Sequence, residues 1–205
     1  MVEKQPLQNQ AYEFLFNAIL KNTFEDGVMY SEGQLTEWLN ISRTPIRSAL
    51  QRLQADGYID IYPSRGFKLH TVTKEDLQEA FQTCIAHEGY CAFCLAQSPS
   101  CASIVTGLRE AIQLQSQCEQ TGDIAAFIEA DRQFHWQIVH SLHNDSFDFA
   151  FTVYRYKIKK FLSESLSKPG AISRSIQDHM DIVQAISNHN LSQMLGLLQR
   201  HHNDF

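Results

Sequence analysis

Three histidines and one aspartate occupy positions at which the helical pattern of the sequence calls for apolar side chains. Asp131 and His135, four residues apart, fall within or beside the apolar stripe of one predicted helix. His179 and His201 interrupt the apolar stripes of two later helices. Burying a polar group without a partner costs about 2–7 kcal/mol, so these four side chains must be satisfied inside the protein.

The spacing of the two later histidines indicates how the group meets. His179 lies eleven residues before Asn190, which is part of a predicted turn, and His201 lies eleven residues after it. If the two flanking helices pair as an antiparallel hairpin, the two imidazoles lie at the same level. Three imidazoles and one carboxylate suit a divalent ion such as Zn²⁺ or Ni²⁺. The alternative is a hydrogen-bonded polar network without metal.

A second group of residues has the chemistry of a DNA contact surface. Arg43 and Arg47 lie one turn apart on a short predicted helix whose apolar residues point to another side. Arginine neutralises phosphates and makes bidentate contacts with guanine edges. Ser42 and Thr44, at the start of this helix, are placed to donate hydrogen bonds to phosphate oxygens. The alternative is that these are solvated surface residues of a helical protein.

A predicted β-hairpin follows that helix. Residues 58–62 and 67–70 alternate like two strands, and residues 63–66 form the turn between them. Arg65 at the tip of the hairpin is placed to enter a minor groove, and Gly66 permits close approach of the backbone. Because two further helical segments precede the arginine-bearing one, this order of elements predicts a winged helix-turn-helix.

The chain beyond a short linker at residues 71–74 is helical in pattern. The predicted helices cover residues 75–97, 102–120, 123–141, 147–167, 173–187 and 191–202. The sequence therefore predicts a mainly α fold. A winged helix-turn-helix DNA-binding domain is expected in residues 1–72, and an all-α antiparallel bundle that serves as the effector domain is expected in residues 75–205.

The charge distribution is compatible with DNA binding by the N-terminal part. The whole chain has a formal net charge of −6, which by itself argues against a nucleic-acid partner. Residues 40–70 nevertheless contain five basic and two acidic residues, whereas residues 73–205 contain ten basic and fifteen acidic ones. A locally basic stretch in an acidic chain is compatible with a compact DNA contact surface.

The sequence indicates a cytoplasmic protein without a membrane span. The N-terminus lacks a basic start followed by an apolar core, so no secretory signal is visible. The charge-free run at 89–108 is interrupted by a turn at 97–100, which indicates two buried helices. The odd number of cysteines, five, indicates reduced thiols, and we interpret the Cys91–Cys94 pair as small core residues rather than a zinc or redox site.

The stretch at 35–66 resembles the GntR family of bacterial regulators, above all through Ile-Ser-Arg-Thr-Pro-Ile-Arg-Ser-Ala-Leu-Gln-Arg-Leu at 41–53. The helical remainder resembles the FadR-type subgroup of that family, with its FCD ligand-binding domain. By matching position, the resemblance implies that DNA is contacted by Arg43, Thr44, Arg47 and Gly66.

The resemblance also covers the histidine cluster. Many FadR-type domains bind a divalent ion through an aspartate, a histidine four residues later and two further histidines. The order here is the same: Asp131, His135, His179, His201. In such domains a small carboxylate effector completes the coordination of the ion, which implies an effector of this class here.

Two positions depart from the family pattern. Gly33 stands where relatives often have a basic residue, so a backbone phosphate contact is either absent or supplied by Gln34. Cys84 stands where relatives commonly have an arginine, four residues before the matching Glu88. The arginine that would bind an organic acid in such relatives is therefore missing at this position. The alternative sources of positive charge are Arg132, Arg155 and Lys159.

These features predict a ligand-responsive transcription regulator, a repressor rather than an enzyme. A homodimer would present two recognition helices about one turn of DNA apart, so we expect the operator in double-stranded DNA to be an inverted repeat. One alternative is a metal sensor, in which the ion itself is the signal. The other is a metal-dependent hydrolase, although no general base or nucleophile lies at motif spacing beside the ligands.

Overall fold

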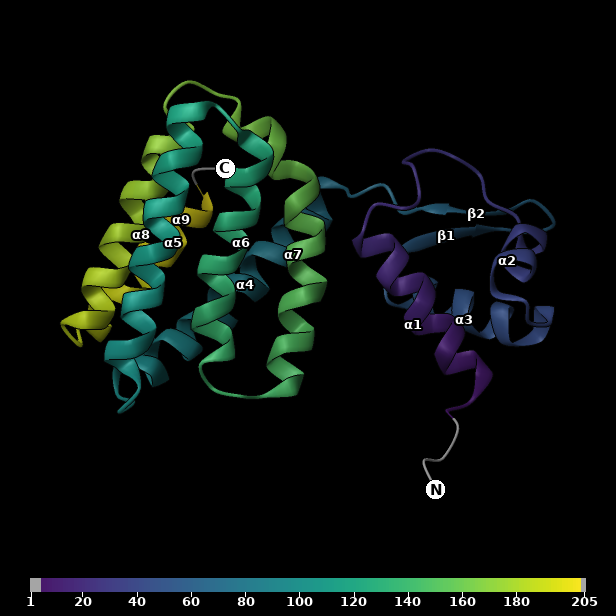
Figure 1. Cartoon of the computed structure of the whole chain (residues 1–205), viewed down its shortest axis with the longest axis horizontal. Helices are drawn as coiled ribbons and strands as arrows, with labels where there is room; N and C mark the ends of the chain where they lie inside the picture. Colours follow the sequence, from purple (N-terminus) through teal and green to yellow (C-terminus); the bar gives the residue numbers. More distant parts are fainter. Residues whose placement is uncertain (1–4, 204–205) are drawn as a thin grey trace. The chain divides into compact units, whose positions relative to one another are not determined.

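The computed structural model describes residues 5–203, which fold into two compact units (Figure 1). The first unit ends at Thr71 and the second begins at Val72. Each unit has its own buried apolar residues, so each is described by itself.

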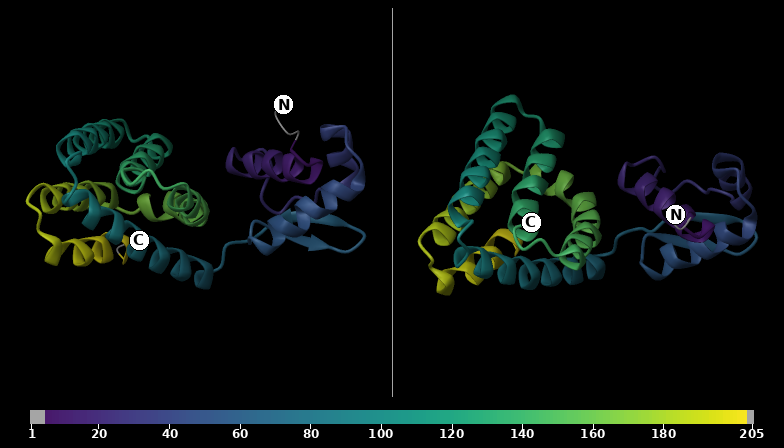
Figure 2. Two further views of the ribbon diagram at one scale, coloured as in Figure 1. Left: turned by 90° about the horizontal axis from the view of Figure 1, so that it is seen from below. Right: turned by 60° about the horizontal axis from the view of Figure 1, so that its bottom comes forward.

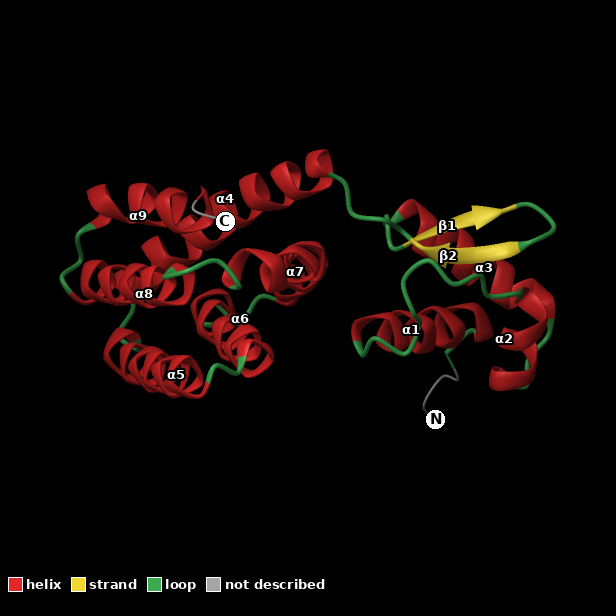
Figure 3. Cartoon of the chain, turned by 90° about the horizontal axis from the view of Figure 1, so that it is seen from above, coloured by secondary structure: helices red, strands yellow, loops and turns green. Residues whose placement is uncertain are grey.

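The N-terminal unit contains three helices followed by a β-hairpin (Figure 3). The elements are α1 (Leu7–Leu20), α2 (Glu32–Leu39), α3 (Arg43–Ala55), β1 (Ile59–Tyr62) and β2 (Gly66–Leu69). The two strands are antiparallel, with Ile59 opposite Leu69 and Tyr62 opposite Gly66. Helix α1 packs against α3, and α3 also contacts α2 and β1. This arrangement confirms the predicted winged helix-turn-helix.

The apolar side of α3 determines which of its residues face outward. Ile46, Ala49, Leu50 and Leu53 recur at helical spacing, and all four are buried in the unit. Pro45 lies in the first turn of the helix, where its missing N–H has no helical acceptor to lose. The opposite side of α3 is therefore presented to solvent.

The start of β2 requires a glycine. Gly66 has a φ of +120°, a conformation that residues with a side chain rarely adopt. A Cβ atom at this position would also collide with the carbonyl oxygen of Tyr30. The backbone of Tyr30 exchanges two hydrogen bonds of 2.9 Å with Phe67, so the segment before α2 is held directly against the hairpin.

The C-terminal unit is an antiparallel helical bundle (Figure 2). Its helices are α4 (Lys74–Ala96), α5 (Cys101–Thr121), α6 (Ile124–His140), α7 (Asp145–Leu166), α8 (Ala171–Ser187) and α9 (Leu191–Asn203). Helix α4 contacts α6, α7 and α9, and α5 contacts α6 and α8. Helices α8 and α9 pack as the hairpin that the histidine spacing predicts. Within residues 5–203, no helix is both long and apolar enough to cross a membrane.

Side-chain caps define where several of these helices begin. Thr73 and Asp76 form a capping box at the start of α4. Asp123 and Asn144 accept hydrogen bonds from backbone amides at the starts of α6 and α7. Gly122, with a φ of +70°, ends α5 in the left-handed conformation. The buried polar residues of the bundle are not part of these caps, so their presence in the core needs another explanation.

Candidate metal centre and nucleic-acid interface

The structure brings the four predicted metal ligands together inside the C-terminal unit. Asp131 and His135 come from α6, His179 from α8 and His201 from α9, and each is at most 1% exposed. The Nε2 atom of His135 lies 3.1 Å from that of His201 and 3.3 Å from that of His179. The Nε2 atoms of His179 and His201 are 3.2 Å apart. Asp131 Oδ1 lies 3.6 Å from His135 Nε2 and 3.5 Å from His179 Nε2.

The other ring nitrogen of each histidine faces an oxygen acceptor outside the cluster. The pairs are His135 Nδ1 with Glu88 Oε2 at 2.6 Å, His179 Nδ1 with Gln115 Oε1 at 2.8 Å, and His201 Nδ1 with Asp178 Oδ2 at 3.7 Å. An imidazole that donates through Nδ1 keeps a lone pair on Nε2, which is the nitrogen that then binds a metal. The two contacts within hydrogen-bond distance therefore direct the Nε2 lone pairs of His135 and His179 into the cluster, where His201 Nε2 also lies.

The donor set fits a small divalent cation. Lone pairs of neutral imidazoles and a carboxylate oxygen repel one another at these separations, because none of them has a proton to share. A cation between them removes this repulsion. The three Nε2 atoms, 3.1–3.3 Å apart, can all lie about 2 Å from a common centre, which matches the zinc–nitrogen distance of about 2.0–2.1 Å. Asp131 Oδ1 lies 3.5–3.6 Å from two of these atoms. The residues present thus suit Zn²⁺ or Ni²⁺, as the sequence predicts.

Protonation of one imidazole also relieves the repulsion between the lone pairs in the cluster. Burial opposes a charge on His135, but the carboxylates of Glu88 and Asp131 outweigh burial and raise the pKa of this imidazole to about 9. Burial, with His201 and His135 nearby, holds the pKa of His179 well below its usual range. Below a pH of about 9, His135 therefore carries a proton when no ion is bound, and this proton and a cation compete for the same Nε2 atom.

Of the three alternative cations, Arg155 is the one that lies in the buried cluster. It is 5% exposed on α7 and donates a hydrogen bond to Oδ2 of Asp131, one of the four predicted ligands. Arg132 instead pairs with Glu129 on the same helix, where both side chains are well exposed, and Lys159 is exposed. Burial raises the pKa of the Asp131 carboxyl, but Arg155 and His135 outweigh it and hold that pKa well below the usual value.

Several buried polar residues around the centre were not predicted from the sequence. Gln115, which accepts a hydrogen bond from His179, and Asp178, which lies 3.7 Å from His201, are 0% and 6% exposed. His202 falls one residue beyond the apolar stripe of α9, yet its side chain is only 2% exposed and faces Cys84 and Glu88 of α4. Gln115 interrupts the buried face of α5, which is the same signal that marks the three histidines of the cluster.

The predicted DNA-contacting residues lie on the exposed side of the N-terminal unit. Ser42, Arg43, Thr44 and Arg47, at the start of α3, are exposed. Ser42 occupies the N-cap position, but in the described part of the chain its side chain makes no capping hydrogen bond. Arg65 at the tip of the hairpin is also exposed.

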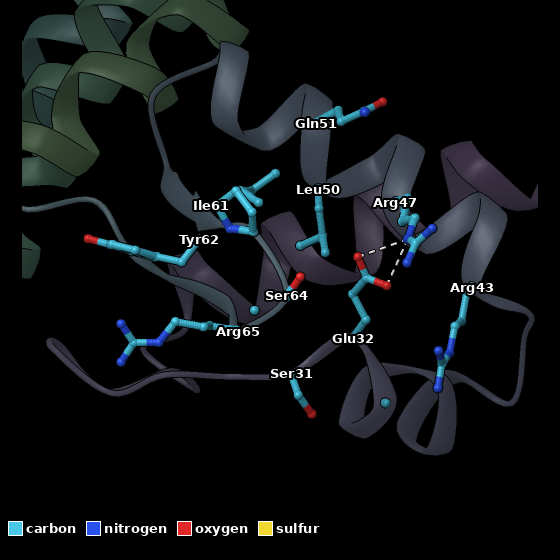
Figure 4. A pocket seen from close by; sticks show the side chains of 13 residues that line it. Ser31, Glu32, Arg43, Arg47, Leu50, Gln51, Ile61, Tyr62, Ser64 and Arg65 are labelled. Atoms are coloured by element: carbon cyan, nitrogen blue, oxygen red, sulfur yellow. Dashed lines mark hydrogen bonds and ion pairs between the residues drawn. The ribbon is translucent and has the colours of Figure 1, made fainter.

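Three of these residues, Arg43, Arg47 and Arg65, line one groove between α3 and the hairpin, whereas Ser42 and Thr44 are not part of its lining (Figure 4). Its lining includes Arg43, Arg47 and Gln51 from α3 and Arg65 and Gly66 from the hairpin. A surface with this many guanidinium groups suits an anionic polymer such as DNA.

Glu32 at the start of α2 holds Arg47 in the groove. The two carboxylate oxygens of Glu32 accept from Arg47 Nε at 2.9 and 2.8 Å. Sequence reasoning did not identify Glu32, because the contact spans two helices. Gln34 is likewise engaged, since its side-chain oxygen accepts from the backbone N–H of Ser31 at 2.7 Å. The amide oxygen of Gln34 thus completes the α2 capping box.

Comparisons with known proteins divide the chain at the same place. The model "Bacterial regulatory proteins, gntR family" matches residues 7–69, and the model "FCD domain" matches residues 79–204.

Similar curated proteins are described as transcription regulators. The uncharacterized HTH-type transcriptional regulator in the TAR-I ttuE-ttuC' intergenic region of Agrobacterium vitis is 34% identical over 131 residues, 63% of this chain and 77% of the relative. The HTH-type transcriptional repressor RspR of Escherichia coli is 24% identical over 200 residues, 89% of this chain and 79% of the relative. Among solved structures, Escherichia coli McbR/YncC superposes with a TM-score of 0.72 at 19% identity, covering 98% of this chain and 95% of that one.

Proposed function

The chain belongs to the GntR family of bacterial regulatory proteins and carries an FCD domain, so it is a DNA-binding transcription regulator and not an enzyme; from this premise we propose that it is a metal-dependent, ligand-responsive repressor. The proposal has four parts: the DNA contact, the dimer, the metal ion and the effector. The observation that carries the metal is the convergence of three Nε2 atoms within 3.3 Å of one another.

Helix α3 is the element that we assign to the major groove. Arg43 and Arg47 are exposed near its start, and the start of a recognition helix is the part that reaches base edges. The hairpin tip with Arg65 is assigned to the neighbouring minor groove. The contact between Glu32 and Arg47 limits the guanidinium to few positions, so less side-chain freedom is lost when DNA binds.

The repressor acts as a homodimer on an inverted repeat in this proposal. Tyr90 and Phe93 of α4 and Phe149 of α7 are 55%, 45% and 49% exposed, although large aromatic side chains are usually covered. Helices α4 and α7 pack against each other, and the Tyr90 ring lies 5.9 Å from that of Phe147. We assign these exposed rings to the subunit interface, which would place two α3 helices on one operator.

The metal ion would be held by Asp131, His135, His179 and His201. When bound, a divalent ion supplies positive charge and a coordination position that a ligand oxygen can occupy. Arg155 holds Asp131 in place and adds a second positive charge. A guanidinium carries five N–H donors, and the hydrogen bond to Asp131 uses one of them. A small carboxylate is therefore the effector class that best matches these charges.

Repression is the direction of regulation that we propose. The related protein RspR of Escherichia coli is described as a transcriptional repressor, and it aligns with 89% of this chain. A repressor of this kind needs the effector to change how its DNA-binding units are placed, which is a coupling between two sites.

A metal sensor is the second candidate, because the ligands lie on three helices. Ion binding at such a site ties α6, α8 and α9 together and is therefore able to act as the signal itself.

One experiment tests the proposed function and separates it from the sensor. Operator DNA is first selected from a random-sequence pool with the purified protein. Binding is then measured by fluorescence anisotropy for chelator-treated protein, zinc-loaded protein, and zinc-loaded protein with a panel of small carboxylates. The proposal predicts that zinc alone leaves affinity nearly unchanged and that one carboxylate lowers it. A change in operator affinity with zinc alone supports the metal sensor. If no DNA sequence is selected, both the proposed function and the metal sensor are overturned.

A further inference from the structure

A second cluster of buried donor atoms lies beside the histidine centre. Cys84 and Glu88 are one turn apart on α4, and His202 lies on α9. Cys84 Sγ lies 3.0 Å from Glu88 Oε1 and 3.1 Å from His202 Nε2, and His202 Nε2 lies 3.8 Å from Glu88 Oε2. All three residues are at most 2% exposed. Their spacing is close to that within the histidine centre, where donors are 3.1–3.6 Å apart.

The three donors differ from the histidine centre in chemistry. A thiolate, a carboxylate and an imidazole make a softer set than three imidazoles and a carboxylate, because sulfur prefers thiophilic ions. Zinc sites with three protein ligands leave one coordination position open to another ligand. We propose that Cys84, Glu88 and His202 bind a second cation, a thiophilic divalent ion such as Zn²⁺, Co²⁺ or Cd²⁺.

Binding at this second site requires one proton to leave. The Cys84 thiol donates a hydrogen bond to Glu88 Oε1 when no ion is bound. When the ion binds, the S–H bond breaks, a sulfur–metal bond forms and the proton passes to solvent. No electron is transferred, so one proton is released for each ion that binds at this site.

Glu88 connects the two sites. One of its oxygens, Oε2, accepts from His135 Nδ1 at 2.6 Å, and the other, Oε1, faces Cys84 at 3.0 Å and the Tyr154 hydroxyl at 3.4 Å. An ion that is coordinated by Glu88 therefore alters the hydrogen-bond acceptor of His135, which is one of the four proposed ligands of the histidine centre. The second site is thus placed to tune the affinity of the first.

Cobalt distinguishes the two sites because only one of them contains sulfur. Reduced full-length protein is freed of metal and titrated with Co²⁺ under anaerobic conditions. The inference predicts two bound equivalents, one of which produces a sulfur-to-cobalt charge-transfer band in the near ultraviolet. Cys84→Ser should lose that band, and Cys91→Ser, at another buried cysteine of the same helix, should keep it. His179→Ala should lose the other equivalent and also keep the band.

The outcomes separate this inference from the proposed function. If Co²⁺ binds without producing a sulfur-to-cobalt band, the second site is overturned. A band that persists in Cys84→Ser overturns it as well. If only one equivalent of Co²⁺ binds, and its sulfur band is still present in His179→Ala, the second site is supported. The histidine centre then does not bind the metal that the proposed function requires. If Cys84→Ser does not fold, X-ray absorption of the Cys91→Ser/Cys94→Ser protein loaded with two equivalents of Co²⁺ decides. A sulfur ligand in that sample supports the second site, and its absence overturns it.

Discussion

Glu88 Oε2 lies 2.6 Å from His135 Nδ1, so the first helix of the FCD domain supplies the acceptor that orients one of the histidines of the proposed metal centre. Both side chains are fully buried. Helix α4 begins at Lys74, three residues after the DNA-binding unit ends at Thr71. A change in the centre that moves Glu88 therefore acts on the helix that is joined most directly to the DNA-binding unit. This contact joins the proposed metal centre to the first helix of the C-terminal unit.

Replacing this acceptor should weaken the metal centre. Loss of a residue that orients a ligand typically lowers metal affinity 10- to 100-fold. We expect Glu88→Gln to lower zinc affinity within this range, about 10- to 100-fold, in a competition titration with a chromophoric chelator. Glu79→Gln, at an exposed glutamate of the same helix, is the matched control. Equal zinc affinity in wild type and Glu88→Gln would remove Glu88 from the centre.

Removing a ligand should lower metal content and stability together. A ligand that binds only the folded protein at 100 times its dissociation constant adds about 2.7 kcal/mol of stability. We expect His179→Ala to contain less metal by elemental analysis and to melt at a lower temperature, with zinc no longer raising its melting temperature. His140→Ala, at an exposed histidine, is the control. Equal metal in His179→Ala and wild type would show that the ligand set is wrong.

Metal binding should depend on pH in a defined direction. Burial opposes the charge on His135, but Glu88 and Asp131 outweigh it and raise the pKa to about 9, so below this pH a proton occupies the nitrogen that the ion needs. Zinc affinity should therefore fall as the pH is lowered from 9 to 7 and level off above 9. Calorimetry in buffers of different ionisation enthalpy should detect about one released proton at pH 7 from this centre. Affinity independent of pH over this interval would contradict the protonated cluster.

The DNA contact is tested by an exposed arginine. Arg47 is 61% exposed in its side chain, so Arg47→Ala should leave the fold intact. Loss of a base or phosphate contact costs about 1–3 kcal/mol, roughly a 5- to 150-fold loss of operator affinity. Arg132→Ala, at an exposed arginine of the other unit, should bind the operator like wild type. Unchanged affinity in Arg47→Ala would exclude this residue from the interface.

The hairpin is tested at Gly66. Gly66→Ala adds backbone strain and places a Cβ atom against the Tyr30 carbonyl oxygen, whereas Gly57→Ala, with a φ of +77° and open space, adds strain alone. Strain of this type costs about 1–3 kcal/mol. We expect Gly66→Ala to lower the unfolding free energy of the N-terminal unit by more than Gly57→Ala does, measured by chemical denaturation. Equal losses would show that the contact with Tyr30 is unimportant.

The sequence predicted most of the fold because its apolar pattern is local. The buried faces of α3 and α6 follow from residues three and four apart, and the turn before Asn190 determines that α8 and α9 form a hairpin. The four residues that meet in the cluster, Asp131, His135, His179 and His201, were identifiable for the same reason, since a polar residue in an apolar stripe stands out. That signal needs no knowledge of the neighbouring helix.

The residues that sequence reasoning missed depend on packing between helices. Gln115 belongs to α5, and its acceptor role exists only because α5 packs against α8, which carries His179. His202 is brought in by α9 in the same way, and the packing of α7 is what selects Arg155 from the three cations that the sequence offered. No spacing within one helix specifies such contacts. The contact between Glu32 and Arg47 joins α2 to α3 and was missed for the same reason.

Anomalous X-ray diffraction at the zinc absorption edge tests the central claim most directly. Crystals are grown from protein incubated with zinc, and data are collected above and below the edge. The account predicts an anomalous peak bounded by Asp131 Oδ1 and the Nε2 atoms of His135, His179 and His201. An ordered cluster without such a peak, with the Nε2 atoms bridged by protons or water instead, would contradict it.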